Sequence, residues 1–164
     1  MHPPTGPAWL VWLETSAAAV AMRQWTWLYP GVEIVHILGF ATLVGAAFMF
    51  DLRLLGISRA LSVSGMERHL LGAARFSVFL VVPSGVLMFM AHATEMASNP
   101  AFRLKLVLLL AAAVNAGVFH RAPFRSVMKW DRHAPAPRAA RVAAALSLIL
   151  WIGVIVCGRL LAYL

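Results

Sequence analysis

Long apolar runs dominate the chain, and regular alternation of polar and apolar positions is rare. Four runs approach or exceed the roughly 20 mostly apolar residues that a membrane-spanning helix needs. They cover 31–50, 76–96, 101–120 and 142–163. Polar residues inside them are isolated, whereas a helix on the surface of a soluble protein carries a continuous polar stripe. The pattern predicts an all-α fold, an integral membrane four-helix bundle over 30–164.

Residues 1–29 follow a different pattern. The stretch 7–22 is shorter than a span, is interrupted by Glu14, and lacks the basic segment that begins a signal peptide. An amphipathic helix lying on the membrane surface fits this stretch better than a fifth crossing. Aromatic residues suited to the headgroup zone follow it, namely Trp25, Trp27 and Tyr29. We therefore predict an N-terminal interfacial helix with an aromatic belt over 1–29.

Composition and charge agree with a membrane protein and predict its orientation. Hydrophobic residues make up 62% of the chain and charged residues 12%, against about 45–50% and about 25% in soluble domains. Most Lys and Arg residues lie in two segments, 51–75 and 121–141. Since basic loops stay in the cytoplasm, both termini should lie outside, together with the tight turn at 98–100. This arrangement accounts for the net charge of +8 without nucleic acid as a partner.

Polar residues inside the predicted spans are the candidates for chemistry, because a charged group at the bilayer centre costs about 2.5–3.5 kcal/mol. Each of the four helices contributes to one layer in the outer half of the membrane. The layer contains Glu33, His36, His92, Glu95, Lys105 and Arg159. At about 1.5 Å per residue, His36 lies roughly 8 Å below the outer end of its helix. Convergence of all four helices on this depth indicates a site.

Two histidines on different helices at matched depth are typical of bis-imidazole haem b ligation. His36 and His92 would be the axial ligands, and Lys105 and Arg159 would face the haem propionates. Two glycines near the histidine faces, Gly39 and Gly85, would leave room for the flat macrocycle. In the alternative interpretation the histidines bridge helices through hydrogen bonds and the glycines serve close helix packing.

A second hypothesis uses sulfur ligands. Met88, His92 and Met96 recur every four residues and would share one face of a continuous helix. Thioether and imidazole groups suit Cu(I), and His36 could complete such a site from the neighbouring helix. Methionine that merely fills gaps is the alternative.

The remaining polar residues have structural interpretations. Asp51 and Arg53 end the first span at the inner surface, where a contact between them, or between Asp51 and another arginine, would anchor the helix. Asn115 could hydrogen-bond across helices. His120 lies near the inner surface, too far from His36 to share one iron. The single cysteine excludes an internal disulfide, and motifs of soluble enzymes are absent.

Several segments resemble a family of small bacterial four-helix inner-membrane proteins with a domain-of-unknown-function label. They are "WLYPGVEIVHILGFATLVGAAFMFDLRLLG" (27–56), "NPAFRLK" (99–105), "NAGVFH" (115–120) and "SLILWIGVIVCGRLLAY" (147–163). The family motif matches Glu33, His36, Asp51, Arg53, Asn99, Lys105, Asn115, His120 and Arg159; His92 is not part of it. The resemblance implies the four-span fold. A more distant similarity extends to copper-resistance D-type proteins and membrane cytochromes b.

Three functions stay open from the sequence. The chain could be a haem b electron carrier, a copper-handling protein, or an accessory subunit without a cofactor. We expect one of these rather than an enzyme. The predicted location is the bacterial inner membrane as a multi-pass protein. Expected partners are the lipid bilayer, membrane redox or complex subunits, and further copies of the chain.

Overall fold

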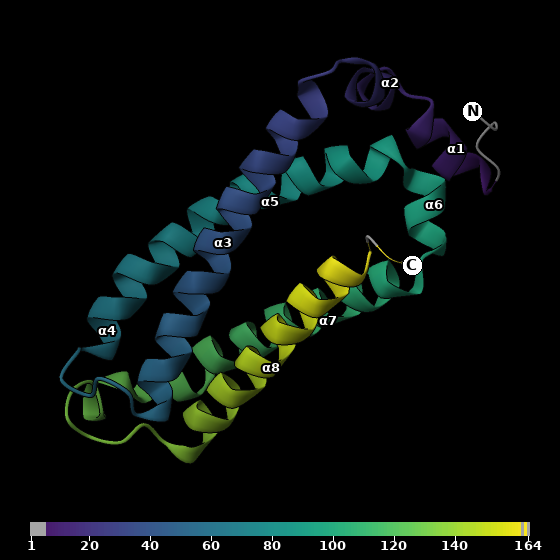
Figure 1. The fold of residues 1–164 in the computed structure, drawn as a ribbon. Coiled ribbons are helices and arrows are strands. Elements are labelled where there is room, and N and C mark those ends of the chain that lie inside the picture. The colour runs from purple at the N-terminus through teal and green to yellow at the C-terminus, as the bar shows by residue number, and fades with distance from the viewer. Residues whose placement is uncertain (1–5, 162, 164) are drawn as a thin grey trace.

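The computed structural model describes residues 6–161 and 163. Positions 1–5 of the predicted N-terminal segment and position 162 of the last predicted span lie outside these residues. Within the described part all regular elements are helices. Four helical stretches are long and apolar enough to cross a membrane, as the sequence predicted. They are Leu28–Leu55, Val63–Ala91, Pro100–Arg121 and Arg138–Leu160 (Figure 1).

The first long helix, α3 (Leu28–Leu55), is longer at both ends than the predicted 31–50. Pro30 falls in its first turn, where a missing N–H costs nothing because that group has no partner inside the helix. Gly56 ends α3 with φ of 110°, the left-handed conformation that glycine adopts without strain. The second stretch begins with α4 (Val63–Met66) and a π-helical turn, η1 (Glu67–Leu71), and continues into α5 (Gly72–Ala91).

The predicted span 76–96 is interrupted at His92. The helix α5 ends at Ala91, and a short helix, α6 (Ala93–Ser98), follows in a new direction (Figure 1). His92 has φ of −140° and ψ of 46°, outside the helical range. The next long helix, α7 (Pro100–Arg121), starts with a strong cap, because Asn99 Oδ1 accepts from the N–H groups of Ala101 at 2.9 Å and Phe102 at 3.3 Å. A 3₁₀ helix, η2 (Pro123–Lys129), leads towards α8 (Arg138–Leu160).

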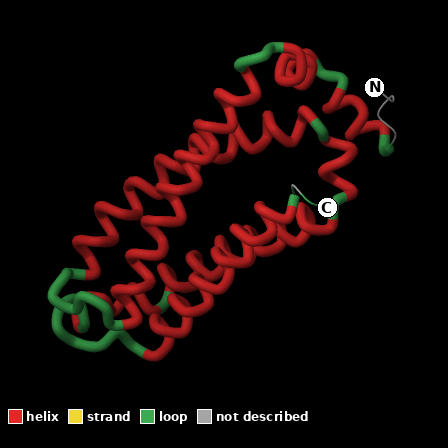
Figure 2. The backbone as a smooth tube through the Cα atoms, in the orientation of Figure 1, coloured by secondary structure: helices red, strands yellow, loops and turns green. Residues whose placement is uncertain are grey.

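The long helices form two antiparallel pairs, α3 with α5 and α7 with α8. The pairs meet where α3 packs on α8. They are also joined by the stacked rings of Phe89 on α5 and Phe102 on α7, whose centroids lie 5.3 Å apart. Figure 2 shows the pairs converging at the end that carries the loops 56–62 and 122–137, and diverging towards the end that carries both termini. We call these the loop end and the terminal end. At the terminal end α6 runs from one pair to the other.

The largest hydrophobic core lies at the loop end. It contains nine buried residues, Phe50, Leu54, Val63, Phe119, Val127, Trp130, Ala136, Ala140 and Ala144. The aromatic rings of Phe50 and Phe119 meet edge to face with centroids 5.7 Å apart, which joins α3 to α7. Elsewhere the long helices expose much of their apolar surface. The most apolar window of α3 is only 11% buried, as expected for helices that face lipid.

The N-terminal segment forms two short helices instead of one. The helix α1 (Ala8–Glu14) ends before Ser16, and Ser16 caps α2 (Ala17–Gln24) by accepting from Ala19 N–H at 3.3 Å. The helix α1 packs on α6, and α2 packs on α3 and α5. Their placement at the membrane surface stays a prediction.

Candidate functional site

His36 of α3 is held by the backbone of α5. Its Nδ1 atom lies 3.1 Å from the Val81 carbonyl oxygen and 3.0 Å from Ser84 Oγ. A carbonyl oxygen only accepts, and the Ser84 hydroxyl donates to Leu80 O, so Nδ1 must carry the proton. In the neutral ring Nε2 is then left with a free electron pair. Among the described residues Nε2 has no hydrogen-bond partner, so His36 is oriented as metal-bound histidines usually are.

The two glycines serve close packing of α3 on α5. A Cβ atom on Gly39 would lie 2.9 Å from Val81 Cγ2, and one on Gly85 would lie 3.1 Å from His36 Cε1. Gly85 therefore makes room for the histidine ring itself. Both glycines thus allow α3 to pack closely on α5, and their role beside a macrocycle stays a prediction.

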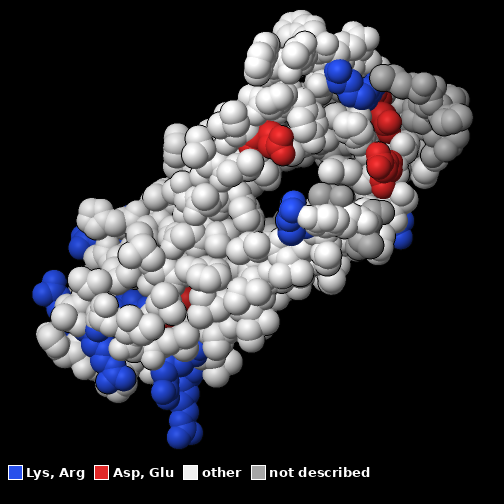
Figure 3. Space-filling model, viewed as in Figure 1, with Lys and Arg blue, Asp and Glu red and all other residues white. Residues whose placement is uncertain are grey.

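The cationic residues of the predicted layer belong to the opposite helix pair. Lys105 of α7 is partly buried, with Nζ 3.9 Å from the position that a Cβ atom on Gly158 of α8 would take. Arg159 is exposed, donates to Tyr163 Oη at 2.5 Å and lies over the Tyr163 ring. Glu33 of α3 is exposed. Figure 3 shows an opening between the two helix pairs, with an acidic side chain on one rim and a basic side chain on the other.

His92 lies at the break between α5 and α6, so the continuous helix face predicted from the sequence for Met88, His92 and Met96 does not form. Its ring meets Tyr29 edge to face at 6.2 Å, and the helix break separates Met88 on α5 from Met96 on α6. The spacing of four residues therefore does not place these three side chains on one helix face. Among the described residues no group of three or more His, Cys, Asp and Glu side chains could hold a metal ion.

The break at His92 is stabilised by the N-terminal helices. Glu14 Oε2 accepts from Thr94 N at 2.8 Å and from Thr94 Oγ1 at 2.7 Å, which caps α6 from another part of the chain. Arg23 donates to the Ala91 carbonyl at 2.7 Å, an orphan acceptor at the end of α5. Burial raises the pKa of the Glu14 carboxyl, but the Thr94 hydrogen bonds and Arg23 outweigh burial and hold this pKa below its usual value.

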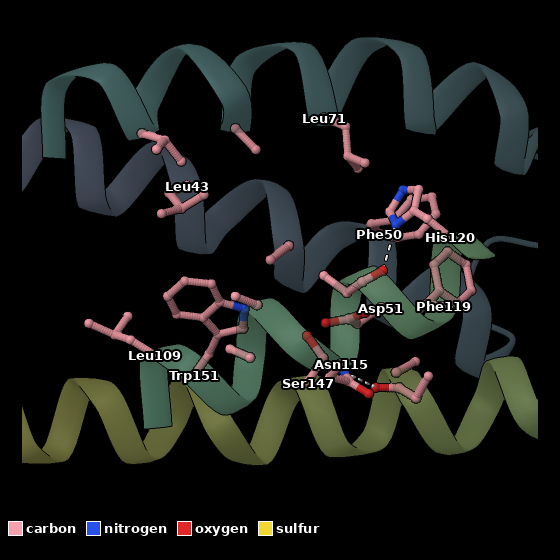
Figure 4. A pocket seen from close by; sticks show the side chains of 18 of the residues that line it. Leu43, Phe50, Asp51, Leu71, Leu109, Asn115, Phe119, His120, Ser147 and Trp151 are labelled. Atoms are coloured by element: carbon pink, nitrogen blue, oxygen red, sulfur yellow. Dashed lines mark hydrogen bonds between the residues drawn. The ribbon is translucent and has the colours of Figure 1, made fainter. Parts of the chain in front are cut away.

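A cavity of about 480 Å³ lies between the helix pairs towards the loop end (Figure 4). We call it the inter-pair cavity; α3, α5, α7 and α8 all line it, mostly with apolar side chains. Asp51, Asn115, His120 and Ser147 supply its polar groups. Asp51 is only 6% exposed, and its Oδ2 atom has no hydrogen-bond partner among the described residues. The Nε2 atom of His120 is likewise buried and unpartnered.

The expected contact between Asp51 and Arg53 is absent from the hydrogen bonds of the described residues. Residues two apart on a helix point to different sides. Arg53 instead donates to the carbonyls of Leu61 at 2.7 Å, Arg59 at 3.2 Å and Asp131 at 3.0 Å, and so joins both loops. Asn115 does form a hydrogen bond across helices, donating Nδ2 to the Ala143 carbonyl at 2.9 Å.

No family model, curated protein or solved structure matches the chain. The family resemblance based on the sequence motifs therefore stays a prediction. The case for a function rests on the geometry of the described residues.

Sequence reasoning missed two features. It assigned Asp51 and His120 to the membrane surface, although both line the inter-pair cavity. It used Glu14 only as an argument against a further span, although Glu14 caps α6. The sequence does carry a signal for Asp51 as a site residue, because this acidic residue directly follows an apolar run. For Glu14 no local signal exists, since its partner is 80 residues away.

Proposed function

We propose that the protein is a membrane electron carrier that binds haem b between its two helix pairs, in the half near the terminal end. The observation that carries this proposal is the hydrogen bond of His36 Nδ1 to the Val81 carbonyl. This bond fixes the tautomer in which Nε2 can bind iron, and it orients the ring before a ligand arrives.

Two further observations support a large ligand at this depth. The helix pairs diverge here, and Figure 3 shows the opening between them. Lys105 and Arg159 lie on the pair opposite His36, where they could bind propionates through charge-assisted hydrogen bonds. Nothing in the geometry favours the copper hypothesis specifically, because the helix break disrupts the face of Met88, His92 and Met96.

The test is an optical spectrum of the full chain, purified in detergent from haem-replete cells, oxidised and then reduced with dithionite. We expect a Soret band and sharp reduced α and β bands. The His36→Ala variant should lose them. His69→Ala is the matched control, since His69 is exposed in η1 near the loop end. A spectrum without visible bands from haem-replete protein would contradict the proposal.

Two further variants test which residue is the second axial ligand. His92→Ala should convert a low-spin iron to a high-spin iron, seen by electron paramagnetic resonance, if His92 is the ligand as the sequence predicted. Lys105→Met should leave the spin state unchanged and weaken haem retention, if Lys105 binds a propionate. A change of spin state in Lys105→Met alone would assign the second ligand to Lys105.

The proposed location is the bacterial inner membrane, with the loop end in the cytoplasm. Basic side chains gather at the loop end in Figure 3, which fits the retention of Lys and Arg on the cytoplasmic side. Cysteine labelling at position 58 in one loop and position 6 near the N-terminus would test this in intact cells. A membrane-impermeant reagent should reach only position 6.

A further inference from the structure

The inter-pair cavity adjoins the proposed haem site at Val81, which lines it and also holds His36, but its two unpartnered polar atoms belong to other residues, Asp51 and His120. We propose that it binds an apolar, membrane-soluble molecule with a hydroxyl head group, such as a phenol, a hydroquinone or a lipid alcohol. The proposal does not depend on haem.

The size and lining of the cavity indicate an apolar ligand body. A volume of about 480 Å³ is within the usual range of about 300–1,000 Å³ for small-molecule sites. The backbones of α5 and α7 stay apart within the described part of the chain. Their stacked rings, Phe89 and Phe102, do not line the cavity. A molecule dissolved in the bilayer could therefore enter between these two helices on the loop-end side of this ring pair.

The polar groups indicate the head group. His120 Nδ1 lies 2.8 Å from the Ala116 carbonyl and so must donate to it, which leaves Nε2 as an acceptor in the neutral ring. Asp51 Oδ2 is the second unpartnered atom, although the Ser147 hydroxyl interacts with the same carboxyl group. Figure 4 shows Asp51 and His120 towards the same end of the cavity, and Trp151 and Leu109 towards the other.

Buried polar atoms without partners are costly, at about 1–3 kcal/mol each, and native proteins rarely leave them so. A ligand that donates hydrogen bonds would remove this cost. A phosphate or carboxylate head would instead face the Asp51 carboxylate. A hydroxyl group has one proton to donate and can also accept, so it can donate to His120 Nε2 while it accepts from a protonated Asp51 carboxyl, or it can donate to an ionised Asp51.

Two probe ligands test this chemistry: 4-dodecylphenol and its methyl ether, 4-dodecylanisole. They differ only in that a methyl group replaces the hydroxyl proton. Binding to the full chain in detergent is counted by mass spectrometry of the intact complex. The phenol should bind at least tenfold more tightly than the ether, because the ether cannot donate. Equal binding of both, or tighter binding of dodecylamine than of the phenol, would overturn the proposal.

Variants locate the site. Ala116→Phe should fill the cavity and reduce phenol binding at least tenfold. Ala139→Phe is its control, since Ala139 is equally exposed but does not line the cavity. Asp51→Asn should weaken binding about fivefold, whereas Glu95→Gln, the same chemical change on exposed α6, should not. Unchanged binding in Ala116→Phe would overturn the proposal even if Asp51→Asn failed to fold.

Competition identifies the natural source of the hydroxyl group. A decyl-substituted benzohydroquinone and dioleoylglycerol are each added to the complex with 4-dodecylphenol. Displacement by the hydroquinone assigns the cavity to a redox lipid, and displacement by dioleoylglycerol assigns it to a membrane lipid alcohol. Failure of both to displace the phenol would count against a membrane hydroxyl ligand.

Discussion

The loop end and the terminal end of the molecule differ in how the two helix pairs are joined. At the loop end aromatic rings from α3 and α7 interlock, and Arg53 binds carbonyls of both loops. At the terminal end the pairs diverge, α6, capped by Glu14, connects them, and the ring of Phe89 on α5 stacks on that of Phe102 on α7. The comparison teaches that close packing at one end allows the helix pairs to diverge at the other, where we propose that a ligand binds.

Removing Arg53 should have the largest effect on stability. Arg53 is 2% exposed, and hydrogen bonds to a charged group contribute about 1.5–3 kcal/mol each. We expect Arg53→Met to lower the free energy of unfolding by about 3 kcal/mol or more, measured by unfolding in mixed detergent and SDS micelles. Arg68→Met, at an exposed site in η1, is the control. Equal losses in both variants would refute a special role for Arg53.

Separating α3 from α5 should have the next largest effect. A side chain on Gly39 would meet Val81 and Leu80 within 3.1 Å, whereas one on Gly45 of the same helix would meet nothing within 4 Å. Gly39→Val should therefore cost about 1–3 kcal/mol through overpacking, and Gly45→Val much less, in the same unfolding assay. Haem retention should fall in Gly39→Val too, because His36 would move from Val81.

Loss of the cap on α6 should have a moderate, pH-dependent effect at the terminal end. Glu14→Gln should cost about 1 kcal/mol at neutral pH, as for other helix caps, and Glu95→Gln should cost little. The pKa of Glu14 is lower in the folded state than in the unfolded state. The contribution of Glu14 to stability is therefore fully present when the pH is above the unfolded pKa, and it is lost as the pH falls through the folded pKa. Hydrogen exchange of α6 amides should therefore rise below about pH 4.5 in the wild type, and a rise confined to alkaline pH would contradict this account.

The hydrogen bond between α7 and α8 should have the smallest effect. Asn115→Leu should cost about 0.6 kcal/mol, near the average measured for such bonds between membrane helices. Thr42→Val is the comparison, since its hydroxyl bonds only to Leu38 O within its own helix. If the two variants lose the same stability, the bond to Ala143 adds nothing between the helices.

The spans were predictable from sequence because a run of about 20 apolar residues has the length and composition of a membrane-spanning helix. The cap at Asn99 was predictable as a turn, since asparagine followed by proline begins helices. The break at His92 was not, because the groups that satisfy its free backbone ends, Glu14 and Arg23, are distant in sequence. The position of Asp51 also depended on tertiary structure: a carboxyl group near a helix end is equally compatible with the membrane surface and with a cavity.

The length of the short helix α6 affects the distance between the two helix pairs at the terminal end. A two-residue turn after α5 would have brought α7 against it, as in an ordinary helical hairpin. Six residues of helix at 1.5 Å each form instead a spacer of about 9 Å, close to the width of one helix. The length of α6, together with the stacked rings of Phe89 and Phe102, therefore sets the distance between the helix pairs at this end. Adding or removing one residue of α6 would change its length by about 1.5 Å and turn α7 by about 100° relative to α5.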